Sequence, residues 1–163
     1  KHAIGRFIAF CDSDDLWEPN KLETQTIFML NNGYDFVYTN LYTSKKKSRR
    51  LPENLDFKEL LKHNYIATST VMLNRDIIKN ISFTNSRKRQ DYIFWLDVLK
   101  NSNQKAYLFN KSLTYYRLRK GSLSSNKLDL LKYHYSIYRR EGFSKIKSFF
   151  FIINYIIHLF IKK

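Results

Sequence analysis

The chain has 163 residues, the length of one ordinary domain, and its hydrophobic content of 44% excludes a disordered protein. Its lone cysteine, Cys11, excludes a disulfide-stapled secreted module, and one cysteine with four histidines argues against a Cys/His zinc module. The net charge is +15, and residues 101–163 hold 13 basic and two acidic residues. This excess of positive charge predicts a polyanionic partner, which could be nucleic acid, a nucleotide diphosphate or an anionic membrane. The alternative is that the charge only keeps the surface soluble.

The first half of the chain alternates predicted strands with predicted helices. Residues 6–11 (RFIAFC) form an apolar run between Gly5 and an aspartate cluster, which predicts a fully buried strand. Asp15 and Pro19 suggest the start of a helix. The other elements expected here are a helix over 20–30 stopped by 31–33, a strand over 34–42, a basic loop over 44–51, a helix through Leu61 capped by Asp56, and a strand over 66–73.

The second half is richer in helices. Residues 90–100 (QDYIFWLDVLK) have apolar side chains at helical spacing, which predicts a helix with one face turned inward. The remaining expected elements are a short helix over 74–80, an irregular loop over 82–89, strand and hairpin material over 105–119, a basic helix over 124–140 and an apolar run over 145–163 with lysines at both ends. Alternating strands and helices predict an α/β fold.

Residues 12–15 (DSDD) directly follow the first apolar strand. In open α/β sheets, ligands bind at the carboxyl ends of the strands. Asp12 and Asp14, two positions apart on a turn, can face one hard cation, and Mg²⁺ commonly binds one or two carboxylates together with substrate phosphates. The alternative from spacing alone is that these aspartates only cap the following helix.

Two more segments carry polar side chains suited to chemistry. Asp91 stands at the start of a predicted helix, where a carboxylate is stabilised by the helix dipole and could serve as a general base or be structural only. The stretch 117–127 contains basic and hydroxyl side chains around Gly121, which suit phosphate oxygens, or which could form an exposed basic turn. The chain contains neither a P-loop nor a G-x-G-x-x-G pattern.

These segments together resemble family 2 glycosyltransferases of the GT-A fold. Residues 5–25 (GRFIAFCDSDDLWEPNKLETQ) are similar to the family's metal-binding segment nearly residue for residue, with a slight departure at Cys11. The resemblance continues, in the family's order, in IATSTVMLNR, RKRQDYIFWLDVLK and LTYYRLRKGSLSSNK, and it covers about 1–140. It implies a partial GT-A, Rossmann-like mixed sheet flanked by helices, with 1–142 as a partial catalytic domain. Beyond the resemblance, the apolar and basic residues of 143–163 predict a C-terminal helix.

The resemblance also implies a role for each matching residue. Asp14 corresponds to the direct Mg²⁺ or Mn²⁺ ligand, with Asp12 beside the nucleotide or metal. Asp91 corresponds to the catalytic base, preceded by Gln90 where many members have Glu. The donor-binding residues are expected to be Asp12, Ser13, Asp14, Arg89, Arg117, Arg119 and Ser122. The loop beside the donor sugar or acceptor is expected to comprise Thr68, Ser69, Thr70 and Gln90.

The implied reaction is metal-dependent, inverting transfer of a single sugar from a nucleotide-sugar, such as a UDP-sugar, to a saccharide or lipid-linked hydroxyl acceptor. Single transfer is favoured because the Q-x-x-R-W string of processive synthases is absent from the sequence. The expected setting is surface-polysaccharide (O-antigen or capsule-type) biosynthesis in bacteria, at the cytoplasmic face of the cell membrane. Two alternatives are a basic nucleic-acid-binding module and an inactive glycosyltransferase fragment.

Two expectations concern the ends of the chain. The family's segments that grip the base and ribose do not precede Lys1, so we expect this to be a C-terminal portion that is inactive alone. Residues 149–161 (FFFIINYIIHLFI) are apolar on every face but shorter than the roughly 20 residues of a membrane span. With flanking lysines they predict an anchor at the membrane interface, or else a helix packed on the catalytic domain or a partner.

Overall fold

The computed structural model describes residues 2–44, 50–86, 88–117 and 127–161. Within them lies a six-stranded mixed sheet in the order β1-β5-β3-β6-β2, with β4 also paired to β6. The β3 and β6 pairing is parallel and the other pairings are antiparallel. The strands are β1 (Phe7–Ala9), β2 (Leu16–Trp17), β3 (Phe36–Tyr42), β4 (Asn54–Leu55), β5 (Met72–Asn74) and β6 (Ala106–Tyr115).

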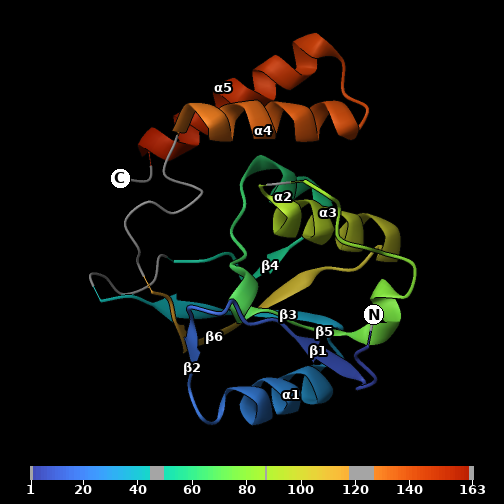
Figure 1. Cartoon of the computed structure of the whole chain (residues 1–163), viewed down its shortest axis with the longest axis vertical. Coiled ribbons are helices and arrows are strands. Elements are labelled where there is room, and N and C mark those ends of the chain that lie inside the picture. The colour runs from blue at the N-terminus through green and yellow to red at the C-terminus, as the bar shows by residue number, and fades with distance from the viewer. Residues whose placement is uncertain (1, 45–49, 87, 118–126, 162–163) are drawn as a thin grey trace.

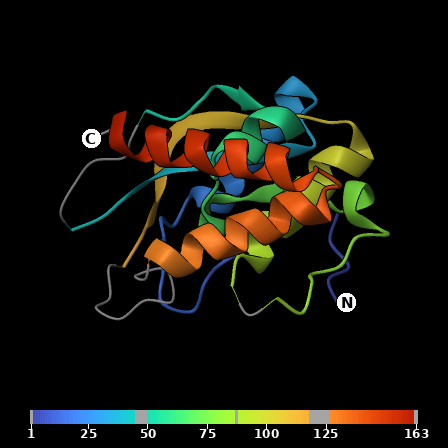
Figure 2. The same ribbon diagram turned by 90° about the horizontal axis from the view of Figure 1, so that it is seen from above.

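Helices cover both faces of this sheet. Figure 1 shows α1 on one face and α2 and α3 on the other, with α4 and α5 forming an outer layer over α2 and α3. Figure 2, seen from above, shows α4 and α5 side by side across that layer. The helices are α1 (Lys21–Asn32), α2 (Phe57–Lys62), α3 (Gln90–Ser102), α4 (Lys127–Arg140) and α5 (Lys145–Ile161), and the 3₁₀ turns are η1 (Thr68–Thr70) and η2 (Arg75–Ile78).

The main core lies between the sheet and α3. Trp95, Tyr38 and Phe36 are fully buried there. The residues at helical spacing in 90–100 that we expect to face inward, Ile93, Phe94, Leu96 and Leu99, are buried. Every other apolar side chain of α3 is buried too, because this helix has the sheet beneath it and the outer helices above it. A helix enclosed in this way needs apolar residues around most of its circumference.

Two predicted helix boundaries are confirmed by their local chemistry. The Asp56 side chain accepts a hydrogen bond from the Glu59 backbone N–H at 2.8 Å, and the Glu59 side chain accepts one in return from the Asp56 N–H, which makes a capping box. Gly33 ends α1 with φ 65°, a left-handed conformation that glycine adopts at little cost.

Several sequence expectations were wrong in detail. Residues 66–73 form η1 followed by the short β5, and not one strand. The described part of 105–119 contains one ten-residue strand, β6, and not a hairpin, while 74–80 contain a 3₁₀ turn. The strand at 6–11 is only half-buried over Phe7–Ala9, because β1 lies at one end of the described strand order and pairs with β5 alone.

The start of the first helix also differs from the prediction. Helix α1 begins at Lys21 after Asn20, whose side chain makes no capping hydrogen bond. Asp15 instead is buried, and its Oδ1 accepts a hydrogen bond from the Arg117 backbone N–H at 3.3 Å. The carboxylate therefore ties the segment after β1 to the end of β6.

The outer helices enclose a histidine without a hydrogen-bond partner. His134 of α4 is fully buried, and neither ring nitrogen has a partner in the described structure. Its ring lies 4.1 Å from that of Tyr155 and 5.4 Å from that of Tyr92. Burial, and then the positive charges of Arg89 and His63, lower the pKa of His134 to about 3.

This histidine predicts a loss of stability in acid. His134 takes up a proton near pH 6.5 in the unfolded chain but only near pH 3 in the folded one. The contribution of the neutral ring to the free energy of unfolding is therefore complete above pH 6.5 and is lost as the pH falls toward 3. Between pH 7 and pH 5 the free energy of unfolding should fall by about 2 kcal/mol from this group. Urea unfolding at the two pH values should show a smaller loss in His134→Phe than in a His2→Gln control, whose histidine is exposed. Equal losses in the two variants would contradict this assignment.

Candidate active site

The aspartate segment follows β1 as a tight turn. Asp12 and Ser13 are exposed, Asp14 is half-buried and Asp15 is buried. The Asp15 backbone N–H donates to the Asp12 carbonyl oxygen at 3.0 Å, which closes the turn. The turn leaves Asp12 and Asp14 at least partly accessible, as binding to a ligand requires.

The 3₁₀ turn η1 holds this segment in place. The Asp12 backbone N–H donates to Ser69 Oγ at 2.9 Å. The Ser69 carbonyl oxygen accepts bonds from Trp17 Nε1 at 2.8 Å and from Thr114 Oγ1 at 3.1 Å. Ser69 is 1% exposed, and the contacts described for it lie within the protein. It therefore acts on Asp12 as a positioning residue.

The next site residue, Asp91, lies beside the same turn. It is the second residue of α3, and its Oδ2 accepts a hydrogen bond from Thr68 Oγ1 at 3.2 Å. Asp91 is half-buried, while Gln90 before it is exposed. Thr70 is 1% exposed and its hydroxyl donates to the Ala67 carbonyl oxygen at 2.7 Å. Of the three predicted loop hydroxyls, that of Thr68 bonds to the Asp91 carboxylate and that of Ser69 to the Asp12 backbone, while that of Thr70 bonds within the turn.

The carboxylates interact electrostatically across the site. Partial burial, followed by the negative charges of Asp15, Asp91 and Asp14, raises the pKa of Asp12. Burial and the same aspartates raise the pKa of the Tyr116 phenol. The structure therefore gathers the predicted metal ligands and the predicted base into one acidic site of an otherwise basic chain.

The donor set fits a hard divalent cation in its chemistry. The carboxylates offer oxygen ligands, their mutual repulsion would be relieved by positive charge, and the buried Asp15 Oδ2 has no hydrogen-bond partner in the described structure. No group of three or more His, Cys, Asp or Glu side chains poised to hold a metal occurs within the described residues. A cation here would therefore draw its other oxygens from water or substrate phosphates.

The predicted basic residues are only partly placed. Arg89 precedes α3 with φ 60°, and its buried Nε has no partner in the described part of the chain. Arg117 is exposed, and its backbone N–H binds Asp15. Arg119 and Ser122 lie outside the described residues.

Sequence reasoning missed a second set of residues beneath the site. Lys21 is fully buried, with Nζ 2.7 Å from Gln25 Oε1 and 4.5 Å from the centre of the Trp17 ring. Burial lowers the pKa of Lys21 to about 8. Gln25 Nε2 donates to the carbonyl oxygens of Thr70 and Val37 at 3.1 and 3.3 Å. Lys21 and Gln25 are four residues apart in the helix, so their side chains lie on one helical face. This spacing is the feature of the sequence from which their contact could have been predicted.

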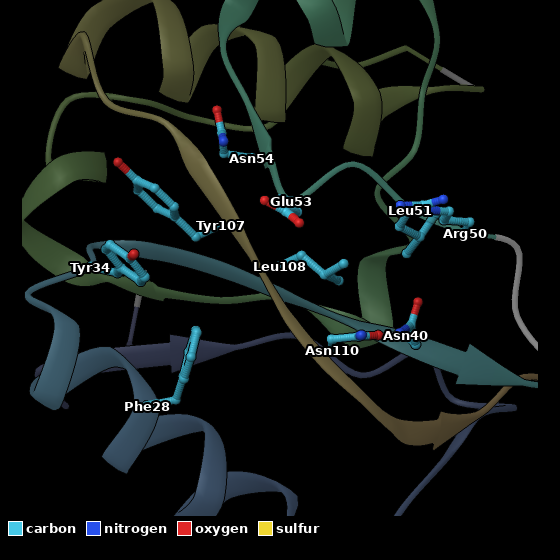
Figure 3. A pocket seen from close by; sticks show the side chains of 10 residues that line it. All are labelled: Phe28, Tyr34, Asn40, Arg50, Leu51, Glu53, Asn54, Tyr107, Leu108 and Asn110. Atoms are coloured by element: carbon cyan, nitrogen blue, oxygen red, sulfur yellow. Dashed lines mark hydrogen bonds between the residues drawn. The ribbon is translucent and has the colours of Figure 1, made fainter.

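A cavity with a different lining lies elsewhere in the described structure. It has a volume of about 660 Å³ and lies along β6 near Tyr107 and Asn110 (Figure 3). None of its lining residues is a predicted site residue. The acidic site is therefore not assigned from cavity size but from the aspartates and the turn that joins them.

The chain is similar in sequence to known glycosyltransferases. The pattern of the family described as Glycosyl transferase family 2 matches residues 1–93. The chain is 36% identical over 161 residues to the UDP-Glc:alpha-D-GlcNAc-diphosphoundecaprenol beta-1,3-glucosyltransferase WfgD of Escherichia coli, over 96% of this chain and 63% of that protein. It is 38% identical over 145 residues to the putative teichuronic acid biosynthesis glycosyltransferase TuaG of Bacillus subtilis (strain 168), over 85% of this chain and 57% of that protein.

A solved structure shares the fold. The structure of S. aureus TarS 1–349 in complex with UDP-GlcNAc superposes with a TM-score of 0.64 at 14% identity, over 94% of this chain and 48% of that chain. This likeness confirms the predicted partial GT-A sheet flanked by helices. The chain spans less than two thirds of the length of these relatives. The similarities do not favour the alternative of a nucleic-acid-binding module.

Proposed function

The chain belongs to glycosyl transferase family 2, and from this premise we propose that the protein transfers a single sugar from a nucleotide-sugar to a hydroxyl acceptor. The observation that carries the proposal is the meeting of Asp12, Asp14 and Asp91 at one site, joined through η1. The proposal concerns the whole protein, because the chain covers 63% of the E. coli relative.

We propose a UDP-sugar donor and a saccharide or lipid-linked acceptor of bacterial surface-polysaccharide biosynthesis. Support for the donor comes from the TarS structures, which were solved with UDP-GlcNAc and with UDP. Support for the acceptor comes from the names of WfgD, which include a diphosphoundecaprenol, and of TuaG, which include teichuronic acid biosynthesis.

The proposal assigns Asp14 and Asp12 to a divalent cation, Mg²⁺ or Mn²⁺. When bound, such a cation would supply positive charge against the diphosphate that leaves. The chain's own contribution is to hold the two carboxylates. The Asp12 backbone is fixed by Ser69 Oγ, and the buried Asp15 holds the turn against the end of β6. Ser13 and Arg117 are proposed to contact the donor, since both are exposed beside this turn.

The proposal assigns proton removal to Asp91. One carboxylate oxygen of Asp91 takes the proton of the acceptor hydroxyl. At the same time the oxygen of that hydroxyl attacks the anomeric carbon of the donor sugar. The new C–O bond forms on the face opposite the leaving diphosphate, whose C–O bond breaks, so the configuration inverts. The Thr68 hydroxyl holds the other Asp91 oxygen in place.

The metal assignment predicts a specific defect in Asp14→Asn. Neutralising this carboxylate should lower Mn²⁺-dependent UDP binding by at least about tenfold, because one charged ligand is lost, a difference of about 1.4 kcal/mol or more. Calorimetric titration of UDP with and without Mn²⁺ measures the effect. Asp76→Asn, an exposed aspartate paired with Lys79, is the matched control and should bind normally. Unchanged Mn²⁺ dependence in Asp14→Asn would overturn the assignment.

The assignment of Asp91 as the base predicts that Asp91→Asn loses turnover but keeps UDP binding. The amide retains the shape and can still accept from Thr68, but it cannot take a proton, so turnover should fall about 10²–10⁴-fold. UDP binding should stay within a few-fold of normal. Steady-state rates and UDP titration of the same preparation separate the two effects. Lost UDP affinity with normal turnover would reassign Asp91 to donor binding.

We further propose that the protein lies at the cytoplasmic face of the membrane through α5. One side of this helix packs on the domain through Ser148 and Tyr155, and the other exposes an apolar stripe. The stripe comprises Ile146, Phe149, Phe150, Ile153 and Ile157, which are 38% to 72% exposed. Lys145 and Lys147 are exposed at its start, where they suit anionic headgroups. Within the described residues, every helix is too short or too polar to cross a membrane.

This location predicts a surface-specific mutant effect. Phe149→Ser with Phe150→Ser should reduce co-sedimentation with phosphatidylglycerol vesicles by at least about tenfold, because these two rings are the aromatic side chains of the stripe and are 61% and 65% exposed. Ile27→Ser with Leu30→Ser, on α1 at the opposite side of the sheet, is the control (Figure 1). Equal vesicle binding by the two double variants would show that α5 serves only packing.

A further inference from the structure

The cavity of about 660 Å³ beside β6 lies at an irregular point of the sheet. Strand β4 pairs with the start of β6 and β2 with its end, so the middle of β6 is left open on that side among the described strands. The parallel register with β3 shifts on both sides of Asn40, which pairs with Ser112 after Thr39 pairs with Phe109. Such bulges redirect side chains and often lie beside binding sites.

The bulge brings two amides together at the cavity wall. Asn40 Nδ2 donates to Asn110 Oδ1 at 2.6 Å. Asn40 is 7% exposed, yet its Oδ1 has no hydrogen-bond partner in the described structure. Figure 3 shows this oxygen directed away from Asn110, on the side of Leu51 and Arg50. A buried acceptor without a donor is costly, and a ligand hydroxyl would satisfy it.

The rest of the lining matches a polyhydroxylated ring. Tyr34 and Tyr107 stack with ring centres 3.7 Å apart and offer an aromatic surface. The Glu53 carboxylate is exposed at the opposite wall and can accept from hydroxyls. The lining carries one positive and one negative charge, Arg50 and Glu53, so it does not favour an anion such as a nucleotide. Its volume falls within the usual range for small-molecule sites.

We infer that this cavity is a second saccharide site, which binds a neutral sugar unit apart from the acidic site. In it, Asn40 Oδ1 and Glu53 accept bonds from sugar hydroxyls, Asn110 Nδ2 donates, and the tyrosine pair packs against the ring. The inference follows from the lining chemistry and does not rest on the proposed reaction. Such a site would let the protein hold one sugar unit of a glycan while another unit of the same glycan reacts at the acidic site.

The test uses isotope-labelled full-length protein and methyl β-glucoside as the probe. Titration should shift the side-chain amide resonances of Asn40 and Asn110. Glu53→Ala and Asn110→Ala should each weaken this binding by at least about tenfold, as expected for the loss of a hydrogen bond to a charged or tightly held group. Both side chains are exposed, so the variants should fold, which thermal unfolding checks. Asn80→Ala, an exposed amide outside the cavity, is the matched control.

Each outcome decides the inference. Shifts with the glucoside that both cavity variants weaken and the control retains would support it. No shift of the two amides, or equal binding by all three variants, would overturn it. Shifts at these amides with UMP but not with the glucoside would also overturn it and identify a nucleotide site. Transferase activity is not a readout, so failure here leaves the proposed reaction standing.

Discussion

The placement of the candidate active site depends on the backbone and side chain of one buried serine. Ser69 Oγ accepts from the Asp12 N–H, and its carbonyl oxygen accepts from Trp17 and Thr114. Its neighbour Thr68 binds Asp91. Segments far apart in the chain thus meet at two consecutive residues of a 3₁₀ turn. Because Ser69 is buried, leaving one of its polar groups unpaired would cost about 1–3 kcal/mol, and the arrangement resists change.

The turn is fixed from the other face of the sheet as well. Helix α1 lies on the face opposite α3, and its Gln25 reaches the carbonyl oxygen of Thr70 (Figure 1). Lys21 in turn holds the Gln25 side-chain oxygen. A fully buried ammonium is unfavourable unless it is compensated, and here the amide and the Trp17 ring compensate it. Helices on both faces therefore converge on the turn that positions the carboxylates.

The sequence was informative where local chemistry decides the structure. The aspartate segment, the capping box at Asp56 and the helix from Gln90 follow from patterns within a few residues. The error at 66–73 has a local cause too. Its β-branched residues favour a strand, but Thr70 Oγ1 bonds to the Ala67 carbonyl oxygen, and such local bonds compete with strand pairing. Strands β2 and β4 have two residues each, too few for any periodicity to reveal.

Residue patterns alone did not predict how distant parts of the chain meet, and only the family resemblance implied a shared site. Asp12 and Asp91 are linked by residues of η1, which the residue pattern of 66–73 placed in a strand. In a strand, Thr68 and Ser69 would point to opposite faces of the sheet, and only one could serve a site on a given face. In the turn, the Thr68 side chain binds Asp91 while Ser69 Oγ and its carbonyl oxygen bind Asp12, Trp17 and Thr114. The local competition that defeats the strand prediction is thus the same feature that joins the two carboxylates into one site.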